Sequence, residues 1–157
     1  MAITALPVTG LSFSINGGFT DAEFTSAINT SGGLPPVNAG TPFVNVPRWS
    51  GGASTQYMIP LADTGYGVTG HADYSYRSRV FHDVTGALDT SQAGYGLLGA
   101  RLSFGPRDGQ WQVSAFGTNI TNRHYITGGA DFTGSLGFDF VVEAPPAEWG
   151  LDLRYNF

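Results

Sequence analysis

Residue types that often carry chemistry are sparse in this sequence, and histidine is the first to consider. The chain has three histidines, His71, His82 and His124, and no cysteine. His71 and Asp73 are two residues apart, so in an extended strand they would share a face and could form half of a metal site. No third ligand accompanies them. We therefore expect this pair to belong to a hydrated polar face.

Two segments, 65–70 and 94–99, match the glycine pattern of dinucleotide-binding loops. That mechanism requires the segment to follow a strand and to open a helix, and neither segment does so. Ser75 and Ser78 also lack the Gly-x-Ser-x-Gly turn that exposes a nucleophilic serine. We predict that the chain is not an enzyme and holds no cofactor.

The charged side chains offer another kind of site. All seven basic residues are arginine. A set of mixed sign falls on the polar side of alternating runs: Asp73, Arg77, Arg79, Arg101, Asp152 and Arg154. Such a set favours a cross-strand ladder that pairs charges and hydrates a wall. The alternative role is contact with a ligand or with another part of the protein, for which Asp73, Arg77, Arg79 and Arg101 are the candidates, Arg77 and Arg79 first.

These residues must be positioned by strands, because alternation of apolar and polar residues runs through most of the chain. The clearest run is 67–81, where Val68, Ala72 and Tyr74 oppose His71 and Asp73. Similar runs occupy 10–24, 48–61, 95–104, 111–125 and 148–157. The sequence predicts an all-β fold, an antiparallel up-and-down meander of about six strands with one apolar and one polar face.

The last run divides its faces most sharply. Leu151, Leu153, Tyr155 and Phe157 alternate with Asp152, Arg154 and Asn156. In the run at 111–125, by contrast, Phe116 interrupts the polar side, so the orientation of its later half stays open.

Composition indicates what the apolar face contacts. Charged residues are only 12% of the chain, yet the mean hydropathy is −0.03, as expected where lipid-facing and water-facing residues alternate in a transmembrane β-barrel. The net charge of −5 leaves no basic stripe for nucleic acid. No apolar run approaches the roughly 18–20 residues of a membrane helix.

The connections between predicted strands alternate in length. Long ones lie at about 26–47, 82–94 and 126–147, and short ones contain Asp63-Thr64-Gly65 and Pro106-Arg107-Asp108-Gly109. A meander would place all long loops at one end, as in barrels with long extracellular loops and short periplasmic turns. Aromatic residues near the strand ends are expected to form interfacial girdles: Trp49, Tyr57, Tyr66, Tyr76, Phe81, Tyr95, Phe104, Trp111, Tyr125, Trp149, Tyr155 and Phe157.

Several segments carry a family resemblance. They are Asn45 to Ser50, Ala72 to Ser78, Tyr95 to Arg101, Asn119 to Tyr125 and Trp149 to Phe157. In order and spacing they resemble the C-terminal part of TonB-dependent outer-membrane receptors. The resemblance implies a 22-stranded barrel with a plugged lumen, of which residues 1–157 would be a single segment supplying the last strands. It also implies an assembly signal in the closing strand, formed by Gly150, Leu151, Leu153, Tyr155 and Phe157.

The resemblance further implies energised uptake of a scarce nutrient such as a siderophore, vitamin or glycan. The expected partners are outer-membrane lipid, the barrel-assembly machinery, the N-terminal plug and remaining strands, and TonB through that plug. The C-terminus would be periplasmic. Pro145-Pro146-Ala147-Glu148 departs from the Pro-Arg that usually enters the family's last strand.

Six strands cannot close comfortably as a barrel, because eight already give an interior that side chains fill. We therefore expect the chain to be a fragment or the product of a truncated gene, with no plug. Two alternatives stay open. One is a small passive porin formed by oligomerisation, and the other is a soluble β-sandwich that binds carbohydrate through Trp49 and Trp149.

Overall fold

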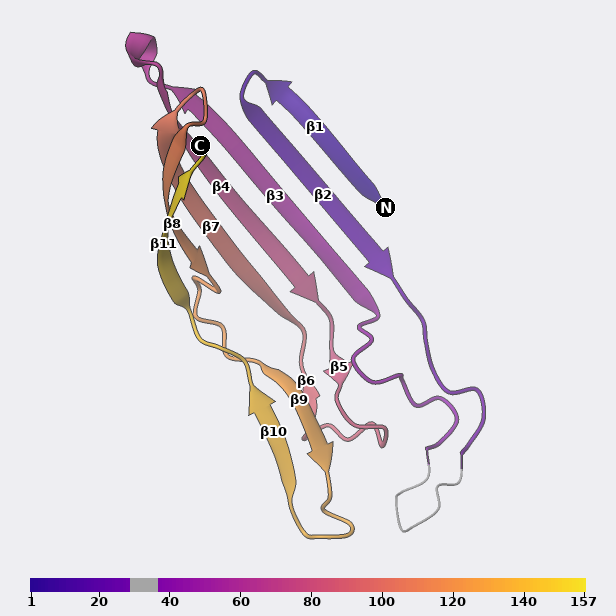
Figure 1. The fold of residues 1–157 in the computed structure, drawn as a ribbon. Coiled ribbons are helices and arrows are strands. Elements are labelled where there is room, and N and C mark those ends of the chain that lie inside the picture. The colour runs from indigo at the N-terminus through magenta and orange to yellow at the C-terminus, as the bar shows by residue number, and fades with distance from the viewer. Residues whose placement is uncertain (29–36) are drawn as a thin grey trace.

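The computed structural model describes residues 1–28 and 37–157, which form one curved antiparallel sheet and two small hairpins (Figure 1). The sheet has seven strands. In spatial order they are β1 (Ala2–Val8), β2 (Leu11–Phe19), β3 (Trp49–Pro60), β4 (Tyr66–Arg77), β7 (Tyr95–Pro106), β8 (Trp111–Thr118) and β11 (Glu148–Tyr155). The hairpins pair β5 (Val80–Phe81) with β6 (Ser91–Gln92), and β9 (Ile126–Asp131) with β10 (Asp139–Glu143). In this part of the chain no helix is long and apolar enough to cross a membrane.

The sheet is an up-and-down meander, so the all-β antiparallel fold predicted from the sequence is confirmed. The tight turns after β1, β3 and β7 lie at one end of the sheet, together with the C-terminus (Figure 1). The turn after β3 contains the 3-10 helix η1 (Ala62–Thr64). The long connections, which contain both hairpins, lie at the opposite end.

Strand register separates two faces of the sheet. Successive pairing of β3, β4, β7 and β8 joins Gln56, His71, Arg101 and Phe116 in one row, which includes the charged side chain of Arg101. The neighbouring row joins Tyr57, Gly70, Leu102, Ala115 and Leu151. Because alternate residues point to opposite sides, the first row belongs to the polar face and the second to the apolar face.

Within residues 1–28 and 37–157, no second protein layer covers the apolar face. Leu151, Leu153 and Trp149 are 82%, 73% and 70% exposed. Among the described residues, the only buried apolar side chains are Val37 and Val80, and both lie in the long connections. The sheet therefore has no hydrophobic core of its own, and an apolar face of this extent requires an apolar environment.

Aromatic rings gather at both ends of the apolar face. Tyr66, Phe104 and Trp111 form a cluster beside the tight turns, with ring centroids 5.5–6.0 Å apart. At the other end Phe19 and Trp49 lie 4.7 Å apart. The girdle assignment of Tyr95 is wrong, because Tyr95 pairs with Arg77 on the polar face and its ring stacks on Tyr125.

The structure also corrects several predicted bounds. β1 has no counterpart among the predicted strands. The run at 10–24 is a strand only to Phe19, and the run at 111–125 only to Thr118, because Asn119 turns the chain with a φ of 47°. The loop predicted at 126–147 contains the β9–β10 hairpin.

Glycines in neighbouring strands make room for aromatic rings. A Cβ on Gly150 would lie 2.5 Å from the Phe116 ring, and one on Gly117 would lie 2.6 Å from Trp149. Both distances are too short for real contacts. In each case ring and glycine are direct partners in the β8–β11 register, so this pairing fixes how the closing strand docks.

Candidate functional site

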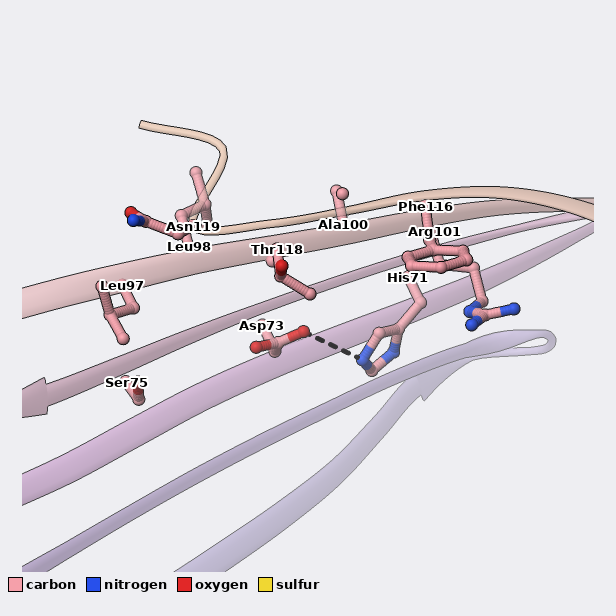
Figure 2. A pocket seen from close by; sticks show the side chains of 12 residues that line it. His71, Asp73, Ser75, Leu97, Leu98, Ala100, Arg101, Phe116, Thr118 and Asn119 are labelled. Atoms are coloured by element: carbon pink, nitrogen blue, oxygen red, sulfur yellow. Dashed lines mark ion pairs between the residues drawn. The ribbon is translucent and has the colours of Figure 1, made fainter. Parts of the chain in front are cut away.

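The polar face contains an open hollow of about 450 Å³ over β4, β7 and β8. Its lining includes the predicted contacts Asp73 and Arg101 together with His71, Ser75, Phe116 and Thr118. Figure 2 shows the His71 ring directed toward the Asp73 carboxylate. Their Nε2 and Oδ1 atoms are 3.7 Å apart. The hollow can therefore offer imidazole, carboxylate, guanidinium and hydroxyl groups to a solute on this face.

Arg101 connects three strands of this face. Its Nη1 donates a hydrogen bond to Asp152 Oδ2 at 3.1 Å, spanning from β7 across β8 to β11. Its guanidinium carbon lies 4.8 Å from the centroid of the Phe116 ring. Phe116 therefore belongs to the polar face, where it is covered by a cation–π contact, and this settles the orientation that the sequence left open.

The expected charge ladder is present only in part. Arg101 pairs with Asp152, but both side chains are 40–50% exposed, so the pair contributes about 0–1 kcal/mol. Hydroxyl pairs complete the cross-strand contacts, with Ser14 and Ser54 2.8 Å apart and Ser103 and Ser114 2.9 Å apart. Among the described residues, no group of three histidine or acidic side chains could hold a metal ion.

A second hollow, of about 370 Å³, lies where β3 and β4 meet the long connections. Arg79 lines it, as does Arg48, a residue absent from the candidates above. Alternation in the predicted run at 48–61 puts Arg48 on the polar side with Ser50, but Arg48 lies just before β3, and its contact with Asp21 joins segments that are distant in sequence. Arg77, two residues before Arg79, lies at the end of β4 on the polar face, where it pairs with Ser50 and Tyr95.

The long connections pack against one another. Asn45 Oδ1 contacts His82 Nδ1 at 2.6 Å, and the backbone N–H of Asn45 donates to the carbonyl of Phe81 at 2.9 Å. Gln92 Oε1 accepts a hydrogen bond from the Ile126 amide at 2.8 Å. The connections therefore form a continuous rim along one end of the sheet.

Asn119 organises the turn that follows β8. It is 8% exposed and has a positive φ, a conformation that asparagine tolerates better than most residues. Its Oδ1 accepts from the Arg123 amide at 2.8 Å, and its Nδ2 donates to the Arg123 carbonyl at 3.0 Å. The turn thus replaces strand pairing with side-chain hydrogen bonds.

Asn119→Ala is expected to destabilise this turn by about 0.5–1.5 kcal/mol, because part-buried backbone groups of Arg123 lose their hydrogen bonds to the Asn119 side chain. Limited proteolysis should then cut within 120–147 faster than in the unsubstituted protein. Thr121→Ala, at an exposed neighbouring position, is the matched control. Equal cleavage of both variants would contradict this role for Asn119.

The closing strand carries most of the predicted assembly signal. Leu151, Leu153 and Tyr155 lie on the apolar face of β11, and Gly150 lies on the polar face beneath Phe116. Phe157 follows the strand, with its ring 5.1 Å from that of Tyr155. Among the strands that the structure describes, β11 pairs with β8 alone, so its other edge is open.

A family model described as "TonB dependent receptor-like, beta-barrel" matches residues 5–122. No curated protein matches significantly.

Solved structures share the fold. The ferric yersiniabactin uptake receptor FyuA of Yersinia pestis matches with a TM-score of 0.75 and 20% identity, over 98% of this chain and 22% of its own. The siderophore receptor PiuA of Acinetobacter baumannii gives a TM-score of 0.73 and 17% identity, over 97% of this chain and 20% of its own. The ferric preacinetobactin receptor BauA of the same organism gives 0.67 and 18%, over 98% and 21%. The chain thus spans about a fifth of the length of these receptors.

Proposed function

Because the chain belongs to the TonB-dependent receptor-like β-barrel family, whose members lie in the outer membrane of Gram-negative bacteria, we propose that it forms part of the wall of a receptor for energised nutrient uptake. The observation that carries the proposal is the division of the sheet into an exposed apolar face and a polar face. The apolar face contacts lipid, and the polar face lines a water-filled lumen.

The open edges of β1 and β11 support a larger barrel. In lipid, each unpaired backbone group costs several kcal/mol, so a sheet with two open edges is not stable there alone. In the proposed receptor further strands pair with both edges, and a plug fills the lumen. β11 then carries the signal read by the assembly machinery, and its end is periplasmic.

In this arrangement the long connections are extracellular and help to capture the ligand. The chain itself catalyses nothing. The similar solved structures are named as receptors for ferric siderophores or siderophores, which supports a siderophore as the nutrient, with a vitamin or glycan as the alternatives.

Growth of the source bacterium under nutrient limitation tests this proposal. Strains with and without the gene are compared under limitation for iron or cobalamin, or with a glycan as carbon source, each with TonB intact or deleted. The proposal predicts that loss of the gene impairs growth in one of these conditions only while TonB is present. A growth defect that does not depend on TonB would indicate a passive porin instead.

A further inference from the structure

The distribution of positive charge at the rim bears on what the receptor captures. The chain is acidic overall, with a net charge of −5 and only seven basic residues. Three of these are near the junction of β3 and β4 with the long connections: Arg48 and Arg79 line the second hollow, and Arg77 ends β4 two residues before Arg79. All three are exposed.

Only one of the three has a carboxylate partner. Arg48 donates to Asp21 Oδ1 from Nε at 3.1 Å and from Nη2 at 2.7 Å. These contacts, with a smaller contribution from Glu23, raise the pKa of Arg48. Arg77 and Arg79 form no ion pair within residues 1–28 and 37–157, and the intervening eight-residue stretch contains no acidic residue.

Arg79 is held in place by a neutral group. Its Nη1 donates to Ser91 Oγ at 2.8 Å, and that hydroxyl donates in turn to the Leu88 carbonyl at 2.8 Å. This contact orients the guanidinium without neutralising it. An oriented guanidinium with remaining donors suits the two oxygens of a carboxylate or phosphate.

The surroundings of the rim fit a ligand that carries such a group. The hollow beside Arg79 is about 370 Å³ and is also lined by Pro42, Trp49 and Phe81. On the polar face of the sheet, Arg77 pairs with Tyr95, whose ring lies 4.5 Å from that of Tyr125 at an interplanar angle of 20°. Glu23 is the one acidic side chain in the lining, and it lies near Arg48.

We propose that Arg79, which lines the 370 Å³ hollow, and Arg77, two residues before it at the end of β4, bind the oxyanion group of the transported ligand, a carboxylate or phosphate. This inference rests on the proposed receptor function and selects, within it, anionic ligands over neutral ones. Arg48 is left out of the proposed oxyanion site, because its charge is already paired with Asp21.

Calorimetric titration of the purified full receptor in detergent tests the site, with citrate and inorganic phosphate as probes. Arg79→Gln and Arg77→Gln should each weaken citrate binding at least about tenfold, the loss expected for a charge-assisted hydrogen bond. The citrate affinity of Arg79→Lys should lie between those of the unsubstituted receptor and Arg79→Gln, because lysine keeps the charge but not the planar fork. Arg107→Gln removes the same charge at the tight-turn end and should change nothing.

A parallel arm uses vesicles with and without phosphatidylglycerol, because a lipid headgroup offers the same chemistry. Binding that depends on Arg79, to either source, supports the oxyanion site and identifies the source. Absence of saturable binding, or equal losses in Arg79→Gln and Arg107→Gln, overturns it. TonB-dependent growth on a neutral nutrient, unaffected by Arg79→Gln, would overturn this inference while leaving the proposed function intact.

Discussion

Leu153→Arg is expected to destabilise the folded barrel by about 2–4 kcal/mol, the cost of an arginine at the bilayer midplane on the lipid face of a barrel. Leu153 is 73% exposed on the apolar face of β11. On that face Trp149 and Tyr155 lie toward the two ends of the strand and bracket it. Urea unfolding of the receptor in lipid vesicles, followed by tryptophan fluorescence, measures the change.

Two controls separate the effect of the face from that of the charge. Gln56→Arg introduces the same side chain on the polar face, in the row of His71 and Arg101, and should cost less than about 1 kcal/mol if that face is hydrated. Asp152→Asn removes only the half-exposed ion pair with Arg101 and should be similarly mild. Equal destabilisation by Leu153→Arg and Gln56→Arg would show that the faces are assigned incorrectly.

Gly105→Ala is expected to destabilise the barrel by about 1–3 kcal/mol, because an added Cβ would overlap the backbone carbonyl oxygen of Trp111. A side chain can rotate away from such a contact, but the carbonyl is held by the β7–β8 hairpin. The same unfolding measurement applies.

Gly70→Ala is the matched control, because nothing lies within 4 Å of an added Cβ there. Alanine lowers the conformational entropy of the unfolded chain, so Gly70→Ala should be neutral or stabilise the protein by up to about 1 kcal/mol. If the two substitutions changed the free energy of unfolding by the same amount in the same direction, β7 and β8 would not approach each other closely at Gly105.

Local alternation was sufficient to predict most of the sheet. In β2, β3, β4, β7 and β11 each polar residue of the pattern lies on the polar face, because register carries the period of two from strand to strand. β1 lacks this signal. It contains Ala2, Ala5 and Pro7, and Pro7 lies where the register with β2 shifts, an irregularity of the kind at which strands tolerate proline.

Features that depend on distant residues could not be predicted. Phe116 is compatible with the polar face only because Arg101, fifteen positions earlier in sequence, lies against its ring. The β9–β10 hairpin contains Gly128 and Gly129, a local signal for a loop, yet it is anchored by Gln92 and Asp83 from another connection. Likewise, the rim that brings Arg48 and Arg79 together is formed by segments that are not adjacent in sequence.

Single-cysteine labelling of the closing strand tests whether one face of this sheet meets lipid and the other meets water. The chain has no cysteine, so once any cysteine in the rest of the receptor is replaced by serine, each introduced thiol reports on one position. Leu151→Cys and Leu153→Cys, on the apolar face, are compared with Asp152→Cys and Arg154→Cys, on the polar face, in the receptor in vesicles. A water-soluble maleimide measures aqueous access, and quenching of an attached fluorophore by brominated lipid measures lipid contact.

We expect a strict alternation along the strand. Positions 152 and 154 should react with the maleimide and escape the lipid quencher, whereas positions 151 and 153 should react slowly and be quenched. Absence of lipid quenching at positions 151 and 153, as in a soluble β-sandwich whose apolar face packs on a second sheet, would show that the apolar face does not meet lipid.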